Sequence, residues 1–243
     1  MLDYDREAAT YDETRGGDAR AVAAAEAVER LLPGGARLVV DVACGTGSVT
    51  AYLRPPGRRV LGVDRSAGMA RVAARRMPGA VTLGDATRLP LPGRSADAVT
   101  LIWLLHLLDP DASAATLREA ARVLRPGGVL VTTVRKNDAA YLTGDPAAAL
   151  IAPVREPYLR PHADAPDRVA ALTGLAELGR VTFAGAGQGR SPRFWRELLA
   201  RRDHGWTAEA DPAALAELDR RLAALPDQDH PGPDPVYTLC AFG

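Results

Sequence analysis

The stretch "DVACGTGSV", residues 41–49, directly follows the apolar run "RLVV" and decides the fold. Gly45 and Gly47 are separated by a single residue, and glycine lets a backbone turn sharply and leaves room for a bulky group to approach it. A loop of this kind, placed after an apolar strand and before a helix, is typical of cofactor sites in α/β proteins. We therefore expect residues 41–49 to hold a cofactor.

Short apolar runs alternate with helical patterns on both sides of this loop. The runs are apolar throughout, as strands of a parallel sheet covered on both faces are. Strands are predicted at 36–43, 58–64, 80–85, 96–103 and 128–134, and helices at 48–55, 67–77 and 114–125, the last ended by Pro126 and Gly127. This strict alternation predicts right-handed βαβ units in an open α/β sheet.

The pattern continues more loosely toward the carboxyl end. Helices are predicted at 165–179, 192–202 and 211–225, and strands at 180–187 and 235–243. The Pro-rich stretch 226–235 is interpreted as a loop and not as a domain linker, because a strand must still return to the sheet after it.

Composition narrows the classes of partner. The chain has 243 residues, and Lys plus Arg equals Asp plus Glu at 30 each, so no charge bias points to nucleic acid or an anionic membrane. Cys44 and Cys240 are the only cysteines, too few for a disulfide framework or a cysteine-ligated zinc site. The charged amino-terminal stretch does not resemble a signal peptide, and no run approaches the roughly 20 apolar residues of a membrane span. We expect a soluble, cytoplasmic protein with no membrane or nucleic-acid partner.

Three acids lie at the ends of predicted strands, on the edge of the sheet where the glycine loop lies. They are Asp41, Asp64 and Asp85. A lone acid at a strand end more often caps the next helix, but three in register behind a glycine loop favour a ligand site. A carboxylate such as Asp64 can accept hydrogen bonds from both hydroxyls of a ribose. A nicotinamide dinucleotide fingerprint would have a third glycine where Thr50 stands, which weakens that reading.

The motifs "VVDVACGTGSVT", "VLGVDRSAGM", "LGDATRLPLP", "ADAVTLIWLLHLLD" and "REAARVLRPGGVLVTT" together resemble those of the class I S-adenosylmethionine-dependent methyltransferases. The resemblance covers about residues 36–134 in the family's order. It implies a Rossmann-like, doubly wound, seven-stranded sheet with an antiparallel last strand and helices on both faces. It also implies S-adenosyl-L-methionine as the cofactor and S-adenosyl-L-homocysteine as the product.

The resemblance assigns roles to positions of this sequence along the length of the cofactor. Around the methionine end it implies Ala43, Cys44 and Gly45, and the stretch "ATYDETRG", residues 9–16, which also resembles the family's entry segment, adds Tyr11 and Arg15 there. Around the adenosine it implies Asp64 at the ribose with Arg65 and Met69 beside it, then Asp85 and Ala86 at the adenine. Near the sulfonium it implies Ile102 and Trp103. One departure is Ala43, where the family more often has glycine, and we expect only a local adjustment there.

The same resemblance implies a division of one domain, residues 1–243, into functional segments. Residues 36–134 are the cofactor-binding core, and 138–165 and 190–230 are expected to cap the acceptor side. Residues 1–20 are charged, are broken by Gly16 and Gly17, and hold few apolar residues that anchor a segment to a core. We expect them to form a mobile lid in which Tyr11 and Arg15, four residues apart, share a helix face.

The acceptor can be narrowed by the motifs that this sequence lacks. The fourth predicted strand carries no Asn/Asp-Pro-Pro-aromatic element of nucleic-acid amino methylation, no Pro-Cys pair supports cytosine chemistry, and no acid cluster suits a magnesium site. A small organic acceptor methylated on O, N or C, with no metal, is the reading that remains. His106 is the candidate general base, because imidazole titrates near neutrality, although a structural histidine fits the sequence equally well.

The sequence leaves two alternative functions open. A nicotinamide-dependent reductase of similar topology is disfavoured by Thr50 and by the lack of a Tyr-x-x-x-Lys pair, since Lys136 is the only lysine. A cofactor-binding protein without transferase activity would keep the same loop, because a cofactor site can outlast an acceptor site.

Overall fold

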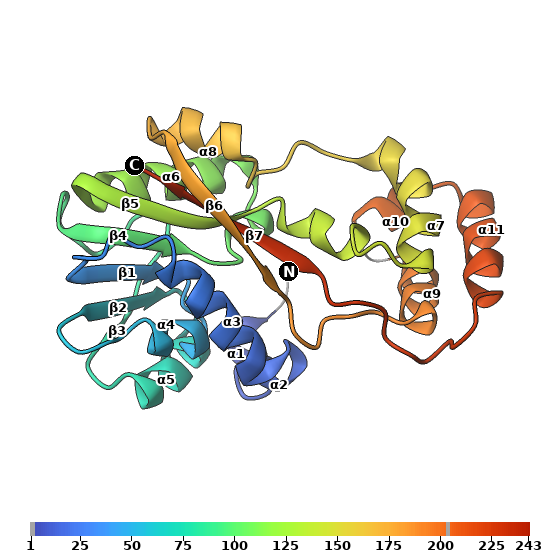
Figure 1. Ribbon diagram of the computed structural model, residues 1–243, viewed down its shortest axis with the longest axis horizontal. Helices are drawn as coiled ribbons and strands as arrows, with labels where there is room; N and C mark the ends of the chain where they lie inside the picture. The colour runs from blue at the N-terminus through green and yellow to red at the C-terminus, as the bar shows by residue number, and fades with distance from the viewer. Residues whose placement is uncertain (1–2, 203–204) are drawn as a thin grey trace. The chain divides into compact units, whose positions relative to one another are not determined.

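The computed structural model describes residues 3–202 and 205–243. A seven-stranded sheet with the strand order β3-β2-β1-β4-β5-β7-β6 organises the chain (Figure 1). The chain divides into two compact units. The first consists of residues 1–136, 162–183 and 237–243, and the second of residues 137–161 and 184–236. The prediction of a single domain stays a prediction.

The first five strands are parallel, and the last strand runs against them. Their bounds are β1 (Leu38–Val42), β2 (Arg59–Asp64), β3 (Val81–Leu83), β4 (Ala96–Leu101), β5 (Leu124–Val134), β6 (Glu177–Ala184) and β7 (Val236–Phe242). β1 pairs in parallel with β2 and β4, and β7 pairs antiparallel with β5. The Rossmann-like sheet with an antiparallel last strand is therefore confirmed.

The apolar strands are buried because helices cover the sheet. All six residues of β4 are buried, which requires cover on both faces. The covering helices of the first unit are α3 (Gly17–Glu29), α4 (Ser48–Tyr52), α5 (Ala67–Arg76), α6 (Pro110–Val123) and α8 (Pro166–Thr173). Ser66 is the N-cap of helix α5, and its hydroxyl accepts a hydrogen bond from the Met69 N–H.

Helices α8 and α6 end earlier than predicted. Helix α8 ends before Gly174, which adopts a left-handed backbone with φ of +71° and terminates the helix. The sequence prediction extended this helix to residue 179, but Gly179 lies inside β6. Helix α6 ends at Val123, so Pro126 does not stop the helix but lies within β5, which begins at Leu124.

The amino-terminal segment has more regular structure than the sequence predicted. It forms two short helices, α1 (Tyr4–Glu7) and α2 (Tyr11–Thr14), before α3 begins at Gly17. Residues 1 and 2 of the predicted lid lie outside the described residues. The mobility of this segment stays a prediction.

The second unit is helical. It contains α7 (Pro146–Arg155), α9 (Pro192–Arg201), α10 (Gly205–Glu209) and α11 (Pro212–Ala223). Trp195, Leu198, Leu218 and Leu222 lie in its apolar core. The predicted cap segments 138–165 and 190–230 fall largely within this unit, apart from residues 203–204, which lie outside the described residues, and their capping role stays a prediction. Within residues 3–202 and 205–243, no helix is both long enough and apolar enough to cross a membrane.

Candidate cofactor site

The glycine loop after β1 has the backbone that its sequence requires. Gly45 and Gly47 have φ of +57° and +74°, in the left-handed region that favours glycine. A Cβ atom on Gly47 would lie 2.9 Å from Met77 Cε and 3.1 Å from Ala73 Cβ, so only glycine lets the loop pack this closely on α5. A Cβ atom on Gly45 would meet nothing within 4 Å, so the space in front of that residue is open.

Ala43 occupies a left-handed position where glycine would be relaxed. Its φ is +59°, which costs a residue with a Cβ atom about 1 kcal/mol. The strain gives a physical reason for the glycine that the family more often has here.

Asp64, at the end of β2, supports the glycine loop directly. Its carboxylate accepts a hydrogen bond from the Gly45 N–H at 2.8 Å and another from the Ser66 N–H at 2.9 Å. The residue is only 7% exposed, and burial raises the pKa of its carboxyl group above the usual range. Asp64, at the end of β2, thus fixes the conformation of the glycine loop that follows the neighbouring strand β1.

Asp41, at the carboxyl end of β1, is the most buried acid of the site. It is 3% exposed and accepts hydrogen bonds from the hydroxyl of Thr100, at 2.7 Å, and from that of Thr50. Burial raises the pKa of its carboxyl group to about 6, against the opposing effect of the two threonine hydroxyls. Thr50 therefore has a defined partner at the position where a dinucleotide fingerprint would have glycine.

Asp85 follows β3 and is exposed. Its carboxylate accepts hydrogen bonds from the N–H and the hydroxyl of Thr87, both at 2.8 Å, and these bonds lower the pKa of the carboxyl group. The local turn thus holds Asp85 ionised at the end of the strand.

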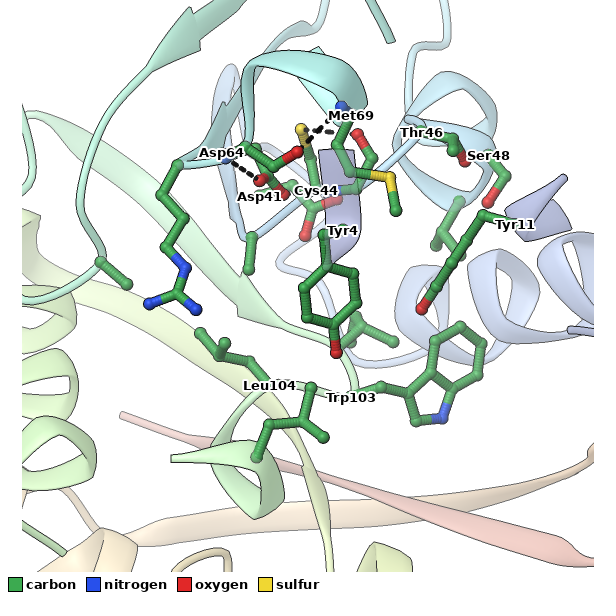
Figure 2. Close-up of a pocket in the computed structure, with 18 of the residues that line it drawn as sticks. Tyr4, Tyr11, Asp41, Cys44, Thr46, Ser48, Asp64, Met69, Trp103 and Leu104 are labelled. Carbon is green, nitrogen blue, oxygen red and sulfur yellow. Dashed lines mark hydrogen bonds between the residues drawn. The ribbon is translucent and has the colours of Figure 1, made fainter. Parts of the chain in front are cut away.

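A cavity of about 570 Å³ lies over these loops, within the range of small-molecule sites. All the residues predicted to bind the cofactor are among those that line it: Tyr11, Arg15, Ala43, Cys44, Gly45, Asp64, Arg65, Met69, Asp85, Ala86, Ile102 and Trp103. The structure therefore brings together positions spread over 93 residues, from 11 to 103. Figure 2 shows Asp64 and Met69 on one side of the site and Trp103 and Leu104 on the other.

The amino-terminal segment lies against this cavity through two acids. Asp5 accepts hydrogen bonds from the Ser66 hydroxyl at 2.7 Å and the Gly68 N–H at 2.6 Å. Asp12 accepts a hydrogen bond from the Thr46 hydroxyl at 2.5 Å and pairs with Arg76 at 2.6 Å. The segment is therefore held to the site by polar contacts, and its Ala8 is buried in the hydrophobic core.

Tyr4 is a site residue that the sequence reasoning missed. Its ring lies between Asp64 and Trp103, 6.2 Å from the ring of Tyr11, and burial raises the pKa of its hydroxyl (Figure 2). The spacing of Tyr4 and Tyr11 at seven residues, two helical turns, was the available signal, but α1 and α2 are separate helices.

Residues 40–132 match the family model described as a methyltransferase domain. The match spans β1 to β5, with the glycine loop and the acids Asp41, Asp64 and Asp85. The match and the strand order support a class I S-adenosylmethionine-dependent methyltransferase domain.

Curated relatives are similar to this chain over about two fifths of its length. An uncharacterized methyltransferase of Mycobacterium tuberculosis is 42% identical over 106 residues, which are 43% of this chain and 42% of the relative. The demethylmenaquinone methyltransferase of Beutenbergia cavernae is 46% identical over 94 residues, 38% of each chain. The chain thus matches about two fifths of the length of these relatives.

A solved structure shares the fold over nearly the whole of this chain. The SAM-dependent methyltransferase of Thermotoga maritima aligns with a TM-score of 0.55 and 18% identity, over 98% of this chain and 97% of that one. At this identity the likeness concerns the fold alone.

Trp103 follows β4 in the methyltransferase fold and has a strained backbone, with φ of +57°. Its N–H donates a hydrogen bond to the Thr133 hydroxyl at 2.8 Å, and the guanidinium carbon of Arg20 lies 3.5 Å from the centre of its ring. Arg20 also lines the cavity, but the sequence analysis did not identify it as a site residue. An arginine on an Ala-rich helix is usually expected to face solvent.

His106, the candidate base, is not part of the cavity wall that the described residues form. It lies in a short three-ten turn, residues Leu105–Leu107. Burial and the nearby positive charges of Lys136 and Arg20 lower the pKa of its imidazole to about 3. The ring is therefore neutral at physiological pH and a weak base.

Proposed function

We propose that this family member binds S-adenosyl-L-methionine in the cavity over the glycine loop and transfers its methyl group to a small organic acceptor. The observation that carries the proposal is that every position to which the family resemblance gives a cofactor contact lines one cavity of about 570 Å³. The open space in front of Gly45 offers room for the methionine end, since no atom lies within 4 Å of a Cβ atom built there.

The nucleoside is assigned to the acids after β2 and β3. Asp64 would accept hydrogen bonds from the two ribose hydroxyls, and its fixed orientation by Gly45 and Ser66 prepares it for that role. Asp85 would accept a hydrogen bond from the adenine amino group, while Thr87 holds its carboxylate in place. Arg65 and Met69 line the cavity beside them and would flank the adenosine.

The methionine end is assigned to the glycine loop and the amino-terminal segment. Residues 43–45 would offer main-chain groups, and Arg15 would pair with the cofactor carboxylate. Tyr11 lines the same cavity, and the guanidinium carbon of Arg15 lies 5.6 Å from the centre of the Tyr11 ring. Residues 1–20 would then act as a lid that closes over the bound cofactor.

Bound cofactor supplies an activated methyl group on a sulfonium. Transfer from it is an in-line displacement, for which the protein's main task is to align the acceptor nucleophile with the methyl group. Ile102 and Trp103 form the wall of the cavity where this alignment would take place. Since the pKa of His106 is lowered to about 3 and the residue is not in the wall, we propose that positioning carries the reaction and that His106 supports the structure.

A small acceptor is supported by charge and by a relative. Equal numbers of acidic and basic residues give the chain no general affinity for polyanions. The Beutenbergia cavernae relative is named for demethylmenaquinone, a small molecule, although the similarity covers 38% of each chain and does not extend to an acceptor identity.

The test is transfer of tritiated methyl from S-adenosyl-L-methionine to a panel of phenols, amines and carboxylic acids. We expect label in at least one acceptor class with the wild-type protein and none with Asp64→Ala at the same cofactor concentration. Tight binding of S-adenosyl-L-homocysteine without label in any acceptor would favour the alternative, a cofactor-binding protein without transferase activity.

A further inference from the structure

Arg20 is a buried cation on the wall of the cofactor cavity. The residue is 7% exposed, and the described ion pairs do not include it. Its Nη1 donates a hydrogen bond to the Arg15 carbonyl oxygen at 2.9 Å, and the guanidinium group also has a side-chain hydrogen bond with Tyr237, while its Nε is buried with no hydrogen-bond partner. A buried charge without a carboxylate is costly, so its position in the wall of a ligand cavity calls for a ligand.

Trp103 provides a second unsatisfied donor beside Arg20. Its indole Nε1 is buried with no partner, and its ring is in stacking contact with the guanidinium group, 3.5 Å from the guanidinium carbon to the ring centre. Phe183 and Tyr237 support the indole with ring centres 6.1 and 6.0 Å away. Guanidinium and indole N–H groups can only donate hydrogen bonds, so the missing partner is a group that accepts them.

The carboxylates that line the cavity already have hydrogen-bond or ion-pair partners. Asp12 pairs with Arg76, and Asp64 accepts hydrogen bonds from main-chain N–H groups. The cofactor brings one carboxylate at its methionine end, and Arg15 is assigned to it. Arg20 is thus a second cation for which neither the described side chains nor the cofactor supplies an anion.

We propose that Arg20, stacked on Trp103, binds an anionic group of the methyl acceptor, a carboxylate or a phosphate. The inference rests on the proposed function, because the acceptor enters the same cavity as the cofactor. It defines a substrate class, small organic anions, within the broad class of small acceptors. The planar guanidinium suits either oxyanion, since its N–H groups can donate two parallel hydrogen bonds.

Fluorine NMR on protein saturated with S-adenosyl-L-homocysteine tests this directly. The probes are fluorinated phenyl carboxylates and phosphates, each matched with its neutral amide or alcohol. We expect the acids to bind better than their neutral partners by about tenfold or more, and Arg20→Gln to remove that preference. Arg20→Lys keeps the charge but loses the planar stack, so it should keep part of the preference. Arg118→Gln, an exposed arginine on α6, is the matched control and should bind as wild type does.

Equal binding of acids and neutral partners, no binding of any acid, or acid binding that survives in Arg20→Gln would each overturn the proposal. Thermal unfolding checks that Arg20→Gln is folded. If Arg20→Gln does not fold, the Arg20→Lys variant provides the test instead. Acid binding by Arg20→Lys that is as tight as in the wild-type protein would then count against the proposal.

A second comparison separates the acceptor from the cofactor as the source of the anion. S-Adenosyl-L-homocysteine carries the amino-acid carboxylate, and 5′-methylthioadenosine lacks it. If Arg20 binds the acceptor, Arg20→Gln leaves the affinity for both ligands within about threefold. A loss of about tenfold or more for S-adenosyl-L-homocysteine alone would place Arg20 on the cofactor and overturn the proposal. Failure of the wild-type protein to bind either ligand would instead refute the proposed function.

Discussion

Asp64 accepts a hydrogen bond from the main-chain N–H of Gly45 at 2.8 Å, so the acid after β2 and the glycine loop after β1 are parts of one structure. A ligand that bonds to Asp64 therefore meets a loop whose conformation is already set. Preorganisation of this kind reduces the entropy that ligand binding must offset.

Asp64→Ala should weaken the binding of S-adenosyl-L-homocysteine by about 100-fold, because it removes charge-assisted hydrogen bonds and loosens Gly45. Asp64→Asn should lose less, since its amide oxygen still accepts a hydrogen bond. Calorimetric titration gives both affinities, and circular dichroism checks folding. An unchanged affinity in folded Asp64→Ala would show that the carboxylate does not bind the ribose.

Asp41 makes stability depend on pH. Its carboxyl group has a folded pKa of about 6, raised by burial above its ordinary 3.8. The stabilisation from its proton is therefore fully present below pH 4 and is lost as the pH rises through 6. The loss amounts to about 3 kcal/mol. Asp41→Asn lacks this term, so urea unfolding should show its stability rising relative to wild type between pH 4 and pH 7. A constant difference between the two proteins would mean that Asp41 titrates normally.

His106→Gln should leave turnover within about threefold of wild type, because the residue is outside the cavity wall. Since burial lowers its folded pKa to about 3, below the ordinary 6.5, wild-type stability should fall as the pH drops from 6.5 toward 3. The variant should lose part of that acid sensitivity. Single-turnover kinetics and urea unfolding measure the two effects. A drop in kcat of about 100-fold with intact cofactor affinity would instead identify His106 as the general base.

The amino-terminal segment should become more ordered when cofactor binds. Asp5 and Asp12 hold it through contacts at the surface of the site, and such contacts contribute little stability alone. Hydrogen exchange of residues 4–14 should slow when S-adenosyl-L-homocysteine is added, and Asp12→Asn should speed exchange without ligand. Deletion of residues 1–15 should leave a folded protein with weak cofactor affinity. Slow exchange that ignores the ligand would make the segment fixed scaffold.

The sequence predicted the sheet well because its signals are local and repeated. Each of these signals indicates the local structure within a few residues. They are the apolar strands, the glycines of residues 41–49 and the acids at the strand ends. Helix α8 was overextended because the apolar pattern continues past Gly174, whose left-handed backbone is visible only in the structure. The mistaken stop at Pro126 arose because proline is also tolerated in a strand at a position that does not need to donate a hydrogen bond.

The sequence predicted only those site residues that belong to recognisable motifs. Asp64 and Asp85 carry a recognisable context, whereas Tyr4 and Arg20 join the cavity through the path of the amino-terminal segment over the sheet. The low pKa of His106 depends first on its burial and then on the charges of Lys136 and Arg20, which are distant from it in the sequence. No local pattern reports such contacts.

Calorimetric titration of the wild-type protein tests most directly whether the cavity over the glycine loop binds an S-adenosyl cofactor. S-Adenosyl-L-homocysteine and NADH are titrated separately into the same protein preparation. We expect one-to-one binding of S-adenosyl-L-homocysteine with micromolar or tighter affinity and no heat of binding with NADH. Binding of NADH with no response to S-adenosyl-L-homocysteine would contradict it.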